Sequence, residues 1–395
     1  MSHAVQFELR LAKRMLRLGT ETAFEVLNRA RELERQGKDI IHLEIGEPDF
    51  DTPENIIQSA VSALNAGWTH YGPSAGLPEL RKVIADEVSH SRGVRVQPEE
   101  VVVVPGGKPI IFFSILALVD EGDEVIYPNP GFPIYESMIN YVGGRGVPIR
   151  LREERDFRLD VGELEKLITD RTRLIIINSP HNPTGGVLNK RDIEQIALVV
   201  GDRNIFVLSD EIYSRLIFEG SHHSIVAEPG FKERTILLDG FSKTYAMTGW
   251  RMGYGVMRPD LAWQVARLMT NSNSCTASFS QIAGIEALRG DQTSVDHMRE
   301  EFQRRRDMFV AGLNRIKGFS CRMPKGAFYV FPNITATGWK SKALADALLE
   351  EAGVACLSGT SFGAFGEGYL RFSIANSMDN LSKALRRVER WISHP

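Results

Sequence analysis

The chain has 395 residues, of which 43% are hydrophobic and 25% are charged, and its formal net charge is −3. This length exceeds what one ordinary hydrophobic core supports, so we expect two domains or one large α/β unit. The charge balance provides no basic surface for nucleic acid or for an anionic membrane. Function must therefore come from a local site.

The three cysteines, Cys275, Cys321 and Cys356, are far apart and odd in number. They form neither a disulfide framework nor a CxxC metal pair, so we expect no bound metal and a reducing, cytoplasmic environment. The sequence has no run of about 18 apolar residues, and we expect no transmembrane helix. Segment 1–18 lacks the apolar core of a signal peptide, which leaves a mitochondrial presequence as the alternative to a cytoplasmic location.

The elements expected first along the chain are a helix near Thr22–Gln36 and a short strand at Ile40–Leu43. From about residue 100, short apolar runs that end in turn residues alternate with amphipathic segments. Such runs are typical of strands buried on both faces, as in a parallel sheet covered by helices. The runs are Val101–Val104, Glu124–Tyr127, Leu174–Asn178, Phe206–Ser209, Thr235–Asp239 and Tyr254–Met257. Because ligands bind beyond the carboxyl ends of such strands, we expect the functional site directly after these runs.

The pattern changes after about residue 290 to that of a smaller α+β domain. The expected elements there are a charged helix at His297–Ile316, short strands near Phe328–Phe331, Val354–Leu357 and Tyr369–Ser373, and a last helix near Asp379–Trp391. We predict that residues 1–45 form an N-terminal arm and part of this small domain. The large domain is predicted over 46–290 and the C-terminal small domain over 291–395.

Gly106-Gly107-Lys108-Pro109 directly follows the strand predicted at Val101–Val104 and opens an apolar helical stretch. Glycines let main-chain N–H groups approach an anion, and a helix N-terminus adds a favourable dipole. Pro109 suits the first helical turn, where its missing N–H costs nothing. The alternative is an ordinary strand-to-helix turn. The segment matches neither a P-loop nor a GxGxxG loop, which disfavours a nucleotide.

Ser242 and Lys243 stand just after the apolar run at Thr235–Asp239, and Arg251 follows eight positions after the lysine. A lysine amine can form a Schiff base with an aldehyde cofactor. A hydroxyl and an arginine can hold a phosphate. These are the parts that a pyridoxal phosphate (PLP) site needs, whereas an isolated lysine is usually just solvated.

Asp210 ends the strand predicted at Phe206–Ser209, and Tyr213 lies three positions further on. A carboxylate at a strand end that faces a low-dielectric site can hold a pyridine nitrogen protonated. The Tyr213 hydroxyl can donate a hydrogen bond to a phenolate oxygen. The alternative is that Asp210 caps the next helix.

Two turn segments add an amide and an aromatic ring. Asn182 lies between His181 and Pro183, which limits its freedom and can direct its side chain inward. Phe132 follows the strand predicted at Glu124–Tyr127, where an aromatic ring can stack on a flat heterocycle. Turn formation and ordinary core packing are the alternatives for these two residues.

Arg371 has apolar neighbours on both sides in the strand predicted at Tyr369–Ser373. A bidentate arginine suits a carboxylate. Most arginines on strands face water, and this is the alternative for Arg371.

Five strand ends carry the segments GGK, PNPGFP, NSPHNPTGG, SDEIY and FSK in this order. Together they resemble the class I/II aminotransferases, PLP enzymes of fold type I, and within them the bacterial aspartate aminotransferase branch. The resemblance runs from Gly46 through Arg371 and includes Tyr71–Arg81, so it covers nearly the whole chain. It implies an α/β fold in which a large domain has a mostly parallel seven-stranded sheet between helices, joined to a smaller α+β domain.

The resemblance also implies a role for each candidate residue. Lys243 would carry PLP as a Schiff base and move a proton, while Asp210 would pair with the pyridinium nitrogen. Around the ring, Tyr213 and Asn182 would bond the hydroxyl and Phe132 would stack. The phosphate would be held by Gly106, Gly107, Lys108, Ser242 and Arg251, and by Tyr71 of the neighbouring subunit in a homodimer with shared sites. The substrate α-carboxylate would be fixed by Gly46, Asn182 and Arg371.

The activity implied is a ping-pong aminotransferase of amino-acid metabolism, biosynthetic in character, acting between an L-amino acid and a 2-oxo acid. We expect 2-oxoglutarate and glutamate as one couple. A PLP-dependent β-lyase that eliminates a thiol from a cysteine conjugate is the alternative. A non-catalytic PLP-binding regulator is a third, disfavoured by the intact Lys243, Asp210 and Arg371. No basic residue dedicated to a side-chain carboxylate is identified, since Gly19 and Thr20 replace a basic or proline position and segment 271–280 has no arginine.

Overall fold

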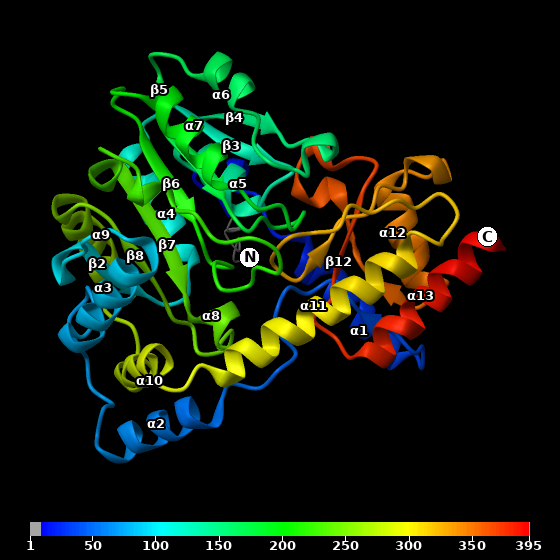
Figure 1. The fold of residues 1–395 in the computed structure, drawn as a ribbon, viewed down its shortest axis with the longest axis horizontal. Helices are drawn as coiled ribbons and strands as arrows, with labels where there is room; N and C mark the ends of the chain where they lie inside the picture. Colours follow the sequence, from blue (N-terminus) through cyan, green and yellow to red (C-terminus); the bar gives the residue numbers. More distant parts are fainter. Residues whose placement is uncertain (1–8, 395) are drawn as a thin grey trace, which may run out of the picture.

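The structure is a computed structural model that describes residues 9–394; positions 1–8 of the predicted N-terminal arm and Pro395 lie outside the described residues. Its centre is a seven-stranded sheet with helices on both faces (Figure 1). The strands are β2 (Val101–Val104), β3 (Glu124–Asn129), β4 (Arg145–Arg150), β5 (Thr172–Asn178), β6 (Phe206–Asp210), β7 (Thr235–Gly240) and β8 (Gly253–Val256). Their order across the sheet is β2-β8-β7-β6-β5-β3-β4.

The predicted seven-stranded, mostly parallel sheet is confirmed. Adjacent strands in the series β7-β6-β5-β3-β4 pair in parallel. Strand β8 runs antiparallel to both of its neighbours, β7 and β2. The six expected runs all form strands in this sheet, with ends shifted by no more than two residues. Strand β4 was not among them, because Arg145, Gly146 and Pro148 break up its apolar pattern.

The central strands are apolar at consecutive positions because both faces of the sheet are covered. In β5, Ile176 belongs to the cluster that contains helices α4 and α5, whereas Ile175 and Ile177 belong to the cluster on the other face with α7. Side chains alternate between the two faces of a strand, so covering both faces removes the usual apolar–polar alternation. The covering helices are α2 (Glu54–Asn65), α3 (Pro78–Arg92), α4 (Lys108–Leu118), α5 (Pro133–Val142), α6 (Val161–Leu167), α7 (Lys190–Val200), α8 (Phe241–Thr244), α9 (Pro259–Ser272) and α10 (Ser278–Arg289).

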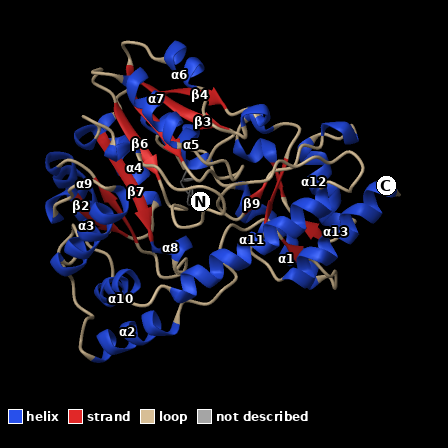
Figure 2. Ribbon diagram, viewed as in Figure 1, coloured by secondary structure: helices blue, strands red, loops and turns tan. Residues whose placement is uncertain are grey.

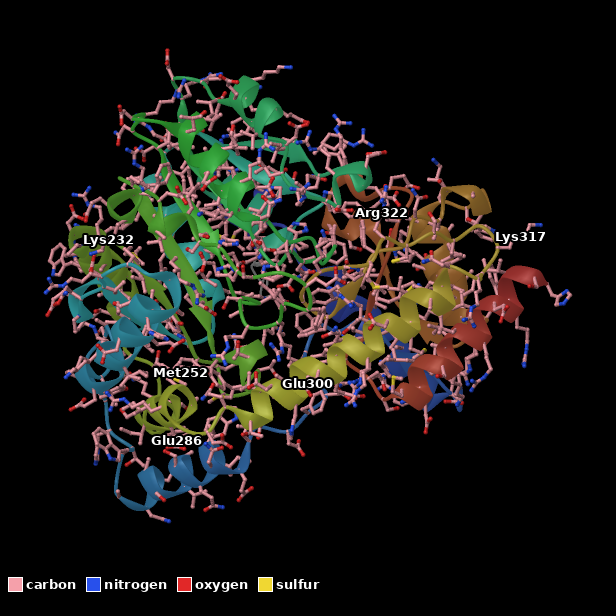
Figure 3. All side chains as sticks on the ribbon, in the orientation of Figure 1. Lys232, Met252, Glu286, Glu300, Lys317 and Arg322 are labelled. Atoms are coloured by element: carbon pink, nitrogen blue, oxygen red, sulfur yellow. The ribbon has the colours of Figure 1, made fainter. Side chains whose placement is uncertain are left out.

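Side chains fill the space between sheet and helices (Figure 3). Met252, labelled in that view, is fully buried directly before β8 and packs against Gly284 of α10. A Cβ at position 284 would lie 2.7 Å from the Met252 methyl carbon, so the helix can come this close only with glycine there.

A second group of elements lies at the other end of the molecule (Figure 2). Its strands are β1 (Ile41–His42), β9 (Tyr329–Val330), β10 (Val354–Ala355), β11 (Leu357–Ser358) and β12 (Leu370–Ser373), and its helices are α1 (Thr22–Arg35), α11 (Thr293–Leu313), α12 (Ser341–Glu350) and α13 (Met378–Ser393). The single strand predicted at Val354–Leu357 is wrong. It is two strands, because β10 pairs in parallel with β1 while β11 pairs antiparallel with β12 in a three-stranded sheet.

The N-terminal segment packs on C-terminal elements. β1 pairs with β10, and Arg29 of α1 forms an ion pair with Asp346 of α12 at 2.8 Å. This packing agrees with the prediction that part of segment 1–45 joins the small domain. The domain boundaries given above stay predictions. Within residues 9–394, no helix is both long enough and apolar enough to cross a membrane.

Candidate active site

A cavity of about 600 Å³ opens at the carboxyl ends of the parallel strands, between the central sheet and the second group of elements. Asn178 ends β5, Asp210 ends β6, and Gly240 ends β7, directly before α8. Asn178 and Asp210 are register partners on adjacent strands, which places their side chains side by side at the sheet edge. The candidate residues that line this cavity are Gly46, Gly107, Lys108, Phe132, Asn182, Asp210, Tyr213, Ser242, Lys243, Arg251 and Arg371.

Lys243 lies in the short helix α8 and points into the cavity. Its ammonium donates a hydrogen bond to the main-chain oxygen of Gly46 at 2.5 Å. The pKa of Lys243 is lowered to about 8, mainly by burial and in smaller part by the nearby guanidinium of Arg371. A substantial fraction of this lysine is therefore a neutral amine near physiological pH, as a nucleophile or a proton acceptor must be.

Asp210 is buried at the end of β6 and accepts a hydrogen bond from the Tyr135 hydroxyl at 2.5 Å. Burial raises the pKa of Asp210 to about 6, against the lowering effect of the hydrogen bond from Tyr135. The alternative of a helix cap is not what the structure shows, since residues 212–215 form a turn and no helix follows Asp210 directly. A carboxylate in this setting favours a cationic partner, which would lower its pKa.

Tyr213 and Asn182 are buried and face the same cavity from two loops. The Tyr213 hydroxyl lies 2.7 Å from the Tyr329 hydroxyl. The side-chain oxygen of Asn182 accepts a hydrogen bond from Arg371 at 3.3 Å. The loop that carries Asn182 is itself held by the Asn178 side chain, which accepts the Asn182 N–H at 3.0 Å. These bonds direct both polar side chains inward.

Arg371 lies on β12, and the alternative that it faces water is wrong, because the residue is only 3% exposed. Its guanidinium donates to the main-chain oxygen of Glu44 and to Asn182, and it lies 4.6 Å from the ring centroid of Tyr329. Its Nε is buried and has no hydrogen-bond partner among the described residues. Burial lowers the pKa of Arg371, but a guanidinium stays protonated. A buried cation with a free donor is arranged to take an anion.

Gly106, Gly107 and Arg251 meet at the N-terminus of α4. Gly106 has a φ of +84°, and a Cβ there would lie 2.0 Å from the Nη2 atom of Arg251. A guanidinium beside an exposed helix N-terminus forms a site for an anion such as a phosphate. Ser242 also lines the cavity. The Lys108 side chain turns elsewhere and forms an ion pair with Glu21.

Of the two remaining aromatic candidates, Phe132 lies in the cavity wall and Tyr71 lies outside it. Phe132 lines the cavity, with its ring centroid 5.8 Å from that of Tyr135 in an edge-to-face arrangement. Tyr71 is 89% exposed and does not line the cavity of its own chain. The structure therefore brings together the predicted site residues of this chain and leaves Tyr71 apart from them.

Sequence reasoning missed several residues that line the cavity or contact its lining. They include Tyr135, which contacts Asp210, Tyr329, which contacts Tyr213, and Glu21, which pairs with Lys108. Nothing in the sequence around the two tyrosines marks them as site residues, because an aromatic residue in a helix or strand most often packs in the hydrophobic core. Glu21 adjoins Thr20, where the N-terminal segment already departs from the expected pattern.

The comparisons with known proteins agree with this fold and site. The family model for aminotransferase class I and II matches residues 38–388. The aspartate aminotransferase of Pyrococcus horikoshii is 41% identical over 96% of each chain, and the aromatic-amino-acid aminotransferase 2 of Thermococcus litoralis is 40% identical over 89% of this chain and 91% of that one. The solved structure of aspartate aminotransferase from Thermus thermophilus with maleate matches this fold with a TM-score of 0.93 at 37% identity, covering 97% of this chain and 100% of that one.

Fold and site thus define a PLP-dependent transferase. The chain belongs to the class I and II aminotransferase family, and it moves an amino group between an amino acid and a 2-oxo acid. The site fits PLP in its donor set: an amine of lowered pKa, a buried carboxylate, and a guanidinium beside glycine main chain at a helix N-terminus. No group of acidic, histidine and cysteine side chains suited to a metal occurs in residues 9–394.

Proposed function

We propose that Lys243 is the catalytic residue of this aminotransferase and that PLP lies between Asp210 and the N-terminus of α4. Bound PLP would act as an electron sink for the substrate Cα. The ring would be held by Asp210, Tyr213, Asn182 and Phe132. The phosphate would be held by Gly106, Gly107, Ser242 and Arg251, and by the main chain of Lys108, whose side chain pairs with Glu21. The Lys243 amine takes a proton from the substrate Cα and returns it, since its lowered pKa lets it serve as both base and acid.

The observation that carries this proposal is the buried guanidinium of Arg371 with its unpartnered Nε, on the wall of the same cavity as Lys243. Every amino-acid substrate has an α-carboxylate, and we propose that Arg371 binds it together with Asn182 and Gly46. Arg371 comes from the second group of elements and Lys243 from the central sheet. Substrate binding would therefore join the predicted domains 46–290 and 291–395 across the cavity and exclude water.

We propose a homodimer with shared sites. In it, Tyr71 serves the PLP phosphate of the neighbouring subunit. Its exposure and its position outside the cavity of its own chain support this assignment. For the cellular setting, we propose a cytoplasmic enzyme of amino-acid biosynthesis, with 2-oxoglutarate and glutamate as one couple.

A panel of the twenty amino acids, each with 2-oxoglutarate or pyruvate as acceptor, tests the proposed function. The expected result is transfer to 2-oxoglutarate from at least one donor. With an amino acid and no acceptor, the absorbance of bound PLP should convert once to that of the amine form and stop. Catalytic release of pyruvate from a cysteine conjugate would instead support the β-lyase.

A further inference from the structure

The segment that carries Gly46 into the cavity also carries a fully buried carboxylate, that of Glu44. The main-chain oxygen of Glu44 accepts a hydrogen bond from the Arg371 guanidinium. The carboxylate oxygen Oε1 lies 2.7 Å from Nδ1 of His42, while Oε2 is buried and has no partner among the described residues. The chemistry proposed above does not use this carboxylate.

His42 connects the buried carboxylate to the surface. Its side chain, at the end of β1, is 30% exposed, and its Nε2 lies 3.1 Å from the Glu34 carboxylate of α1. The hydrogen bond with Glu44 raises the pKa of His42 to about 9, and Glu34 contributes in smaller part. The imidazole is therefore cationic at neutral pH, and it balances a carboxylate that would be costly to bury alone. Charges of alternating sign thus run from Arg371 through Glu44 and His42 to Glu34.

The Glu44 carboxylate is close enough to Arg371 to act on its charge. Burial lowers the pKa of Arg371, and the Glu44 carboxylate is one of the groups that oppose this effect. A negative charge at this place also reduces the attraction of the guanidinium for a second anion, because charges interact strongly in a buried site. A cationic His42 neutralises Glu44 and removes this competition.

We propose that His42 and Glu44 are positioning residues that act through Arg371: while His42 is protonated, the pair leaves the Arg371 charge free to bind the substrate α-carboxylate. The inference rests on the proposed function, in which Arg371 binds that carboxylate, and adds a regulation by pH to it. His42 is charged below about pH 9, so binding is supported there and weakens as pH rises through 9. Because every amino acid has the α-carboxylate, the change is the same for all substrates.

The other ionisable groups near the pair and its arginine do not reproduce this profile. Besides Glu34, they are Glu21, Tyr213, Lys243, Tyr329, Asp346 and Cys356. Burial raises the pKa of the thiol and of both phenols, so these groups stay neutral while His42 loses its proton. Lys243 titrates in a neighbouring range, but it is present in every variant compared below, so its contribution cancels.

The test measures the dissociation constant of maleate, a carboxylate ligand that cannot be transaminated, by calorimetry on the PLP-loaded protein between pH 7 and 10. In His42→Gln we expect binding about fivefold weaker than in the wild type near pH 7.5, with the difference vanishing above about pH 9.5. KM for glutamate and for leucine should rise by the same factor while kcat stays unchanged. His90→Gln, at an exposed histidine of α3, is the matched control and should behave as the wild type.

A second variant separates the effect of charge from an effect on the fold. Glu44→Gln removes the competing negative charge, so it should bind maleate at least as tightly as the wild type near pH 7.5 and lose the weakening at pH 9. His42→Gln/Glu44→Gln should bind as the wild type does near pH 7.5. A pair that serves only the fold would weaken binding in all three variants. That result, or equal binding by His42→Gln and the wild type, would overturn the inference.

The same measurement on Arg371→Ala distinguishes this inference from the proposed function. Weaker maleate binding in that variant, at every pH, supports Arg371 as the carboxylate anchor through which the pair acts. Unchanged maleate binding in Arg371→Ala would instead overturn the proposed role of Arg371 itself.

Discussion

The hydroxyl of Tyr135, on helix α5, donates a 2.5 Å hydrogen bond to the carboxylate of Asp210 at the end of β6. Both groups are buried, and this bond opposes the burial that raises the pKa of Asp210 to about 6. Tyr135 thereby keeps the carboxylate ionised near neutral pH. An ionised Asp210 is what the proposed contact with a protonated pyridine nitrogen requires.

Tyr135→Phe should therefore change the pH dependence of PLP binding. Protonation of Asp210 weakens the binding of a cationic ring, so affinity falls as pH drops through the pKa of Asp210, near 6 in the wild type. Losing a hydrogen bond to a charged group raises that pKa, and the fall should begin about one pH unit higher. PLP titrations of the apoprotein between pH 5 and 8 measure this. Tyr141→Phe on the same helix should behave as the wild type, and an unshifted profile in Tyr135→Phe would contradict the role given to Tyr135.

Arg371→Ala should raise KM for all amino acids alike. The variant removes the charged contact to the α-carboxylate, which is common to every substrate, and we expect a loss of at least about thirtyfold in kcat/KM. Steady-state kinetics with acidic, apolar and aromatic donors measure the effect. Arg322→Ala, at an exposed site labelled in Figure 3, is the control. An effect confined to acidic donors would mean that Arg371 binds the side chain instead.

Arg92→Met should destabilise the fold. The Arg92 guanidinium contacts Glu211 at 2.9 Å and Asp239 at 2.8 Å, and all three side chains are buried. Removing the cation leaves the buried Asp239 without a guanidinium partner and Glu211 with His222 at 2.7 Å as its remaining ion-pair partner. We expect a cost of about 3–5 kcal/mol in the free energy of unfolding. Urea unfolding of the apoprotein measures this, and Arg92→Lys should recover part of the loss. Equal stability of Arg92→Met and the exposed control Arg95→Met would show that the ion pairs contribute nothing.

The sequence alone predicts those site residues that directly follow a recognisable pattern, such as an apolar run that forms a strand. Asp210 and Lys243 each follow an apolar run, and a strand end that faces a ligand is a place the sequence pattern can predict. It could not find pairs that depend on packing between distant segments. Tyr135 and Asp210 are 75 positions apart and Glu21 and Lys108 are 87 apart, so only the folded chain brings them together.

The same limit applies to the fold. The runs buried on both faces were predicted because burial of both faces leaves a continuous apolar signal. The two-residue strands β10 and β11 are too short to show a period, and only Cys356 separates them where the chain passes from one sheet to another. Their separation follows from the pairing partners β1 and β12, which lie elsewhere in the sequence.

The most direct test of the central claim is single-turnover kinetics of Lys243→Ala with an amino acid that the wild type accepts. PLP binding through the remaining residues should persist, because Asp210 and the glycine-rich helix N-terminus are unchanged. Conversion of the bound PLP absorbance to that of the amine form should slow by at least about 10³-fold, since the variant lacks the amine proposed to move the Cα proton. Conversion at the wild-type rate would contradict the assignment of Lys243 as the catalytic residue.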